Sequence, residues 1–142
     1  MKSILVTAIQ IAVQAHGETL DKSGQPYILH PLRVMMAQMS DVSRIAGILH
    51  DVVEDTNVTI DDLRSAGIPE ESLTAIVMLT HEESEPYEEY INKLYQNHIA
   101  KSVKLADLLD NMNVLRLPGF TQKDLGRLAK YRRAYEFLSE ET

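Results

Sequence analysis

The most unusual stretch of the sequence places one histidine and three carboxylates within six residues, His50-Asp51-Val52-Val53-Glu54-Asp55. On an α-helix these four polar side chains fall within one arc of about 140°. Three carboxylates so close together repel one another, and they are unfavourable at a helix C-terminus. A bound divalent cation would offset this cost, with His50 and Asp51 as adjacent ligands. The alternative interpretation is an exposed helix end whose solvated acids have no function.

Two polar residues far from this stretch also need an explanation. His30 directly precedes Pro31, a residue typical of the first helical position, so His30 is expected at or beside a helix N-cap. Asp107 lies between apolar neighbours, where an unpaired buried carboxylate would be costly. Lys104, Asp107 and Asn111 share one helix face by their spacing. An ion pair between Lys104 and Asp107 would explain two of these residues but not Asn111.

The elements that must position these residues are predicted to be helices almost throughout. Apolar residues recur at helical spacing over about residues 4–16, 31–39, 42–53 and 101–115. Thr59 and Thr121 are each followed three residues later by Asp, a pattern that resembles a capping box at a helix start. Pro69 and Pro86 mark two further helix starts, and no alternating run supports a strand. The sequence therefore predicts an all-α bundle of seven or eight helices.

Composition and length exclude several classes of protein. A chain of 142 residues, 44% hydrophobic and 25% charged, is expected to form one globular domain. Lys and Arg total 14 against 21 Asp and Glu, a net charge of −7 that disfavours nucleic-acid and anionic-membrane partners. No cysteine is present, which excludes disulfides and thiolate metal sites. Neither a signal peptide nor a run of about 20 apolar residues is found, so a cytoplasmic location is expected. The sequence leaves a homo-oligomer open.

Four blocks of sequence, in a fixed order, stand out along the chain. They are Ala15-His16, Lys22 to Pro31, Leu49 to Thr56, and Val103 to Asp107 with Asn111-Met112. Together they resemble the HD-domain metal-dependent phosphohydrolases, and within them the guanosine-polyphosphate hydrolase branch (the SpoT/Rel hydrolase domain and its small single-domain relatives). A single His-Asp pair is uninformative, whereas four blocks in the family's order are specific. The resemblance implies one HD-type helical domain over residues 1–142.

The same resemblance implies a metal site and a catalytic pair. The implied ligands are His30, His50, Asp51 and Asp107. Two imidazoles and two carboxylates suit Mn²⁺, with Mg²⁺ or Fe²⁺ as other ions, better than a structural Zn²⁺. Glu54 and Asp55 match the family's catalytic acids. Glu54 is the first choice as general base because it shares a predicted helix face with His50, and Asp55 could orient the water.

The implied substrate is a small phosphorylated nucleotide, and the leading choice is the 3′-pyrophosphate of guanosine tetra- or pentaphosphate. Lys22 and Asn111 match substrate-contacting positions, and Lys22 and Lys104 would add positive charge to the site. His16 matches a family residue but ends an apolar stripe, so a packing role beside the site is expected. His81 and His98 match none of the blocks and are expected at the surface, and Tyr27 is expected to fix its loop by packing.

The sequence departs from the family pattern at the position that reads the base. The family commonly carries an arginine directly before the lysine matched by Lys22, and its guanidinium packs against guanine. Asp21 stands there in this chain, which removes the stacking plane and reverses the charge. Leu108 and Asp110 likewise replace the family's Arg and second His. Two alternatives therefore stay open: a hydrolase of another nucleotide or phosphorylated cofactor, and a nucleotide-binding module without catalysis.

Overall fold

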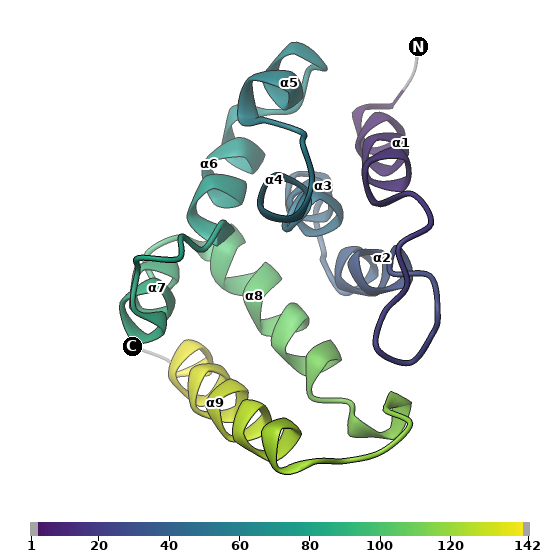
Figure 1. The fold of residues 1–142 in the computed structure, drawn as a ribbon. Coiled ribbons are helices and arrows are strands. Elements are labelled where there is room, and N and C mark those ends of the chain that lie inside the picture. The colour runs from purple at the N-terminus through teal and green to yellow at the C-terminus, as the bar shows by residue number, and fades with distance from the viewer. Residues whose placement is uncertain (1–2, 141–142) are drawn as a thin grey trace.

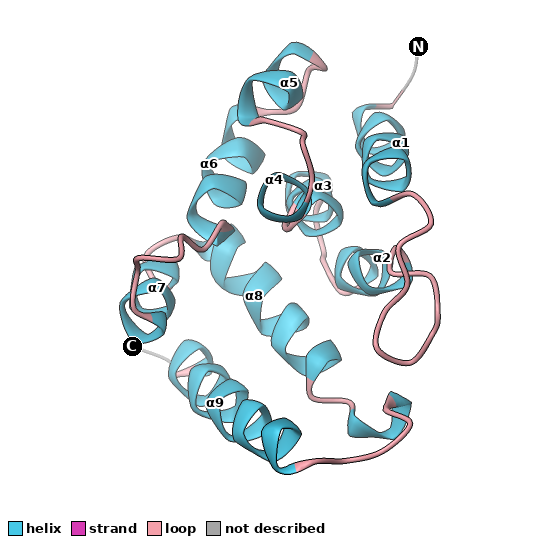
Figure 2. Ribbon diagram, in the orientation of Figure 1, coloured by secondary structure: helices cyan, strands magenta, loops and turns pink. Residues whose placement is uncertain are grey.

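Helices account for most of residues 3–140, the part of the chain that the computed structural model describes (Figures 1 and 2). This part contains nine α-helices and one 3₁₀ helix and no strand longer than an isolated bridge, which confirms the all-α prediction. The expected domain of 1–142 includes two residues at each end that lie outside the described range. The helices are α1 Ile4–His16, α2 Leu29–Met36, α3 Asp41–Leu49, α4 Val52–Asp55, α5 Ile60–Ser65, α6 Glu70–Leu79, α7 Tyr87–Leu94, α8 His98–Asn111, η1 Val114–Arg116 and α9 Gln122–Ser139.

Helix starts follow the capping signals of the sequence. The Thr59 hydroxyl accepts the Asp62 N–H at 3.1 Å, and the Asp62 carboxylate accepts the Thr59 N–H at 2.9 Å. The same reciprocal capping box opens α9 between Thr121 and Asp124. These bonds satisfy N–H groups that have no partner within the first turn of a helix. Helices α6 and α7 begin directly after their prolines, as predicted.

The helix expected over residues 42–53 is interrupted, and this part of the prediction is wrong. Helix α3 ends at Leu49 and α4 begins at Val52, with Asp51 between them at φ −118° and ψ 6°. The interruption accounts for one helix more than the predicted number. It also relieves the crowding of acids at the end of one long helix, because Glu54 now belongs to a separate short helix. The single polar arc inferred from helical spacing therefore does not exist.

Helix α3 lies at the centre of the bundle and packs against α1, α2, α6 and α8 (Figure 1). Its side chains Ile48 and Leu49 are completely buried. Gly47 allows α2 to approach α3 closely, since a Cβ at this position would lie 3.2 Å from the Met35 Cα atom. This contact brings the last turn of α2 against the last turn of α3. At the start of α2, the His30 ring lies 5.4 Å from the His50 ring, and α8 packs against both helices.

Helix α8 differs from its predicted bounds at both ends. Its N-cap is Asn97, whose side-chain oxygen accepts the N–H groups of Ile99 at 3.0 Å and Ala100 at 2.9 Å. It ends at Asn111 rather than near 115, and η1 follows. Helix α9 then runs back along α8 and closes that side of the molecule (Figure 1). Within the described part of the chain, no helix combines the length and the apolar character that crossing a bilayer requires.

Candidate active site

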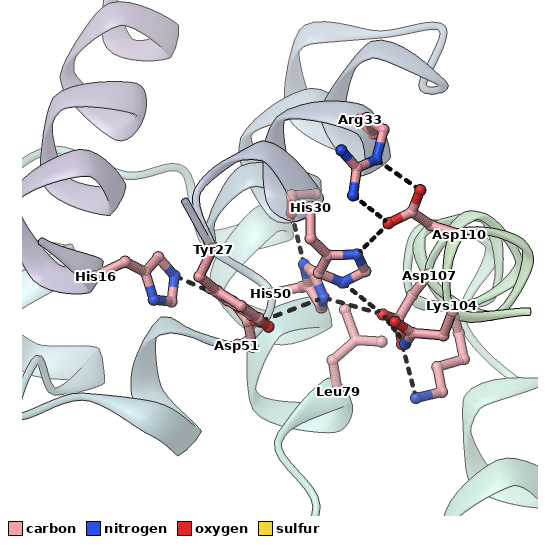
Figure 3. A network of polar contacts seen from close by, with 12 residues as sticks. His16, Tyr27, His30, Arg33, His50, Asp51, Leu79, Lys104, Asp107 and Asp110 are labelled. Atoms are coloured by element: carbon pink, nitrogen blue, oxygen red, sulfur yellow. Dashed lines mark hydrogen bonds and ion pairs between the residues drawn. The ribbon is translucent and has the colours of Figure 1, made fainter. Parts of the chain in front are cut away.

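Three side chains from three helices converge at the end of α3 (Figure 3). His30 comes from the first turn of α2, His50 directly follows α3, and Asp107 comes from α8. Each leaves only 6% of its surface exposed, and one ligand atom from each lies within 4.8 Å of the other two. Asp107 Oδ1 is 2.9 Å from His30 Nε2 and 3.4 Å from His50 Nε2. Two imidazole nitrogens and a carboxylate oxygen facing one point can hold a metal ion.

Asp51, the fourth predicted ligand, lies next to this group but outside it. Its Oδ2 atom is 3.8 Å from His50 Nε2 and accepts a hydrogen bond from the Tyr27 hydroxyl. Its Oδ1 atom is 3.2 Å from His16 Nε2, although the two atoms are not aligned as a hydrogen bond. His16 and Tyr27 thus both hold Asp51, and Tyr27 does more than fix its loop by packing.

The charge of Asp107 is balanced from several sides. Lys104 Nζ lies 2.9 Å from its Oδ2, so the predicted ion pair is present, and Asn111 Nδ2 donates to its Oδ1 at 3.1 Å. Burial alone would raise the pKa of Asp107, but Lys104 and the bonds from His30 and His50 hold this pKa well below its usual range. Burial lowers the pKa of His50, yet the charges of Asp51 and Asp107 raise it to about 9. The centre therefore attracts positive charge strongly.

Sequence reasoning missed the group that holds the outer nitrogen of His30. Its Nδ1 atom lies 2.6 Å from Asp110 Oδ2, and Arg33 Nε donates a hydrogen bond to Oδ1 of the same carboxylate at 2.6 Å. His30 and Arg33 are one turn apart on α2, as Asp107 and Asp110 are on α8. This pair of spacings was the available signal, and it becomes informative only once the two helices are known to pack together.

The two predicted catalytic acids follow the centre on α4 and are both exposed. Glu54 Oε1 accepts the backbone N–H of His81 at 2.6 Å. His81 is half-buried, and its ring lies 4.5 Å from that of Tyr90, so the expectation of a plain surface histidine is wrong there. Asp55 lines a cavity of about 360 Å³ together with His16 and Tyr27. Desolvation, followed by the charges of Asp51 and Glu54, raises the pKa of Asp55.

A second cavity of about 370 Å³ opens on the other side of Tyr27. Lys22 and Asn111, the residues expected to contact substrate, line this cavity, and Asn111 also donates to Asp107. Lys104 does not line it, since its side chain is only 13% exposed and bound to Asp107. Neither cavity is lined by the two buried histidines of the centre. Four further lining residues were missed by sequence reasoning: Arg116, Phe120, Arg127 and Tyr131.

Asp21 has a structural task in the loop that carries Lys22. Its Oδ1 accepts bonds from the Ser23 N–H at 2.9 Å, the Ser23 hydroxyl at 2.7 Å and the Gln25 N–H at 3.0 Å. Gly24 takes a φ of 84° within this turn, a conformation that favours glycine. The bond from the Ser23 hydroxyl is the main reason that the pKa of Asp21 is lowered. Asp21 therefore stabilises the loop beside the cavity rather than offering a flat surface to a ligand.

The sequence is similar to parts of several long bacterial proteins. It is 31% identical over 134 residues to the guanosine-3′,5′-bis(diphosphate) 3′-pyrophosphohydrolase of Aquifex aeolicus, covering 87% of this chain and 19% of that protein. It is 35% identical over 138 residues to the protein of the same name from Borreliella burgdorferi, covering 87% and 20%. It is 33% identical over 128 residues to the bifunctional (p)ppGpp synthase/hydrolase RelA of Mycobacterium tuberculosis, covering 80% and 17%. The chain thus spans about a fifth of the length of these curated relatives or less, and no protein-family model matches it.

The fold is also found in a solved structure. The match has a TM-score of 0.81 at 24% identity and covers 98% of this chain and 87% of that one, which is described as a metazoan ortholog of SpoT that hydrolyzes ppGpp. Because this likeness extends over nearly the whole chain, the fold predicted from the four blocks is confirmed. By sequence, the chain is therefore similar to one part of guanosine-3′,5′-bis(diphosphate) 3′-pyrophosphohydrolases and of a RelA protein, and it has the fold of the metazoan SpoT ortholog.

Proposed function

We propose that this protein is a metal-dependent phosphohydrolase that removes the 3′-pyrophosphate from guanosine 3′,5′-bis(diphosphate). The observation that carries the proposal is the convergence of His30, His50 and Asp107 within 4.8 Å, together with a cavity whose lining residue Asn111 donates to Asp107. The names of the relatives from Aquifex and Borreliella support the choice of reaction. The substrate and the residues assigned below are part of the proposal.

The proposed metal ligands are His30, His50, Asp51 and Asp107. The residues fit a divalent ion because their nitrogen and oxygen atoms are of the types that Mn²⁺, Mg²⁺ and Fe²⁺ accept, and Mn²⁺ is the ion we propose. Asp51 would join them through its carboxylate, whose Oδ2 atom lies 3.8 Å from His50 Nε2. The raised pKa of His50 means that binding of the ion displaces a proton.

A divalent ion held there supplies a Lewis acid beside the phosphate and lowers the pKa of a nearby water. Glu54 is the proposed general base. Its Oε1 is held by the His81 N–H, which leaves Oε2 as the atom that takes the proton. Asp55 orients the attacking water from the neighbouring cavity. The proton leaves toward solvent, since both acids are exposed.

The cavity of about 370 Å³ that Lys22 and Asn111 line is the proposed substrate site. Lys22, Arg116 and Arg127 supply positive charge for a polyphosphate, and Phe120 and Tyr131 supply aromatic faces for a base. Phe120 and Tyr131 would take the place of the arginine that stacks on guanine in the family, where this chain has Asp21. Asn111 lines this cavity and also donates to Asp107 Oδ1 in the proposed metal centre. Lys104 adds positive charge through its ion pair with Asp107 Oδ2.

A nucleotide panel assayed with Mn²⁺ tests this proposal. We expect release of pyrophosphate from guanosine 3′,5′-bis(diphosphate), and roughly tenfold or more lower kcat/KM with the adenosine analogue, which lacks the guanine edge. GTP and phosphorylated cofactors form the rest of the panel, and chelation of the metal is the control. Turnover of another compound without turnover of the guanosine substrate would contradict the substrate and favour the alternative that Asp21 raises.

A further inference from the structure

His30 is held between two carboxylates that belong to the same face of α8. Its Nε2 atom faces Asp107 Oδ1 at 2.9 Å inside the proposed metal centre, and its Nδ1 atom faces Asp110 Oδ2 at 2.6 Å outside it (Figure 3). The His30 side chain is 7% exposed and that of Asp110 is 12% exposed. Because a carboxylate only accepts hydrogen bonds, the proton on this side of the ring must sit on Nδ1.

Asp110 is itself fixed by two arginines. Arg33 donates from Nε to Oδ1 at 2.6 Å and from Nη2 to Oδ2 at 3.0 Å, a two-pronged contact of fixed direction. Arg116 Nη2 lies 3.2 Å from Oδ2 and also donates to the Asp110 carbonyl oxygen. Burial alone would raise the pKa of Asp110, but His30 and Arg33 lower it, so the carboxylate stays ionised. Its orientation is therefore set before any ligand arrives.

We propose that Asp110 is a positioning residue of the metal centre: it accepts the Nδ1–H of His30 and thereby turns the Nε2 lone pair toward the ion. This inference rests on the proposed function, because it requires that His30 bind a metal. A histidine ligand whose second nitrogen donates to a carboxylate is fixed in tautomer and ring direction and is a stronger donor. Arg33 and Arg116 act on the ring through Asp110.

The contacts do not fit a simple ion pair between α2 and α8. For comparison, Arg64 pairs with Glu70 at 2.8 Å and with Asp61 at 3.0 Å, and all three of these side chains are exposed. Asp110 instead has a buried imidazole on one oxygen although two arginines already balance its charge. Without Asp110, the buried Nδ1–H would have no acceptor.

The test compares Mn²⁺ binding to the metal-free protein and to variants by titration calorimetry. Asp110→Ala is expected to raise the Mn²⁺ dissociation constant about 10- to 100-fold, the usual effect of removing a residue that hydrogen-bonds to a metal ligand. Asp110→Asn keeps an oxygen acceptor for the His30 Nδ1–H, so it should raise the dissociation constant less. Glu70→Gln is the matched control, because it also removes a carboxylate from an arginine, and its dissociation constant should equal that of the unchanged protein.

A second readout separates positioning from general loss of structure. In spectra of ¹⁵N-histidine-labelled, metal-free protein, the His30 Nδ1–H is expected to exchange slowly, and this protection should vanish in Asp110→Ala and persist in Glu70→Gln. If Asp110→Ala loses the protected proton yet binds Mn²⁺ as tightly as the unchanged chain, the inference is overturned. If the unchanged protein binds no Mn²⁺, this result contradicts the proposed metal-dependent function itself, and the role proposed for Asp110 falls with it. If Asp110→Ala does not fold, Asp110→Asn decides by the same two measurements.

Discussion

Replacement of Asp107 by Asn is expected to abolish Mn²⁺ binding and to lower the free energy of unfolding of the metal-free protein by about 3–5 kcal/mol. The large effect on stability follows from Lys104, whose ammonium lies 2.9 Å from Asp107 Oδ2 with only 13% of its side chain exposed. Without the carboxylate this charge is buried and unpaired. The protonated forms of His30 and His50 lose the same partner. Urea unfolding and calorimetric titration with Mn²⁺ measure the two effects.

A double variant separates the two roles of Asp107. Lys104→Met combined with Asp107→Asn leaves no buried ammonium, so stability should recover in part while the Mn²⁺ site stays lost. Lys104→Met alone serves as the matched control, because it keeps Asp107. Tight binding of Mn²⁺ by the double variant would show that Asp107 is not a ligand, and the proposed centre would then be incorrect.

Replacement of Glu54 by Gln is expected to lower kcat by about 10²- to 10⁴-fold, the usual contribution of a general base. Glutamine retains an oxygen that can accept the His81 N–H, so α4 and its neighbouring loop should stay in place. The Mn²⁺ dissociation constant and the unfolding free energy should therefore be unchanged. Steady-state kinetics with the guanosine substrate give kcat and KM separately, and calorimetry provides the metal control.

Asp55→Asn is the comparison that makes this result decisive. Asp55 is the other acid of α4 and lines the cavity on the far side of Tyr27, so its loss should reduce kcat less than the loss of Glu54. The opposite order would assign the base to Asp55, whose pKa is raised by desolvation and by its acidic neighbours. Activity that survives both changes would contradict acid–base catalysis by this pair. A protein without turnover before any change would instead match the non-catalytic alternative.

Local rules gave most of the fold correctly. Capping at Thr59 and Thr121 depends on residues three positions apart, and apolar spacing depends on one helix at a time, so both can be read from sequence. The interruption between α3 and α4 could not, because helical spacing assumes that the helix continues through Asp51. Because of this interruption, His50 and Glu54 do not share one helix face, which was the first reason for choosing Glu54 as the base.

Contacts between distant parts of the chain were the second limit. Three of the four predicted ligands meet in the structure, and the resemblance rather than spacing had grouped them. The bond between His30 and Asp110 joins positions 80 apart, so the spacings on α2 and α8 become informative only once the two helices are known to pack together. The cavity residues Arg127 and Tyr131 lie one turn apart on an amphipathic helix, where an arginine and a tyrosine usually face solvent or the core.

The most direct measurement of the central claim is turnover of guanosine 3′,5′-bis(diphosphate) in H₂¹⁸O, with metal-free protein and after addition of Mn²⁺. Attack of water on the phosphorus attached to the 3′ oxygen predicts GDP and pyrophosphate as products, with one ¹⁸O in the pyrophosphate and none in GDP, and no products before Mn²⁺ is added. Equal turnover without any divalent ion, or no turnover with it, would contradict the account.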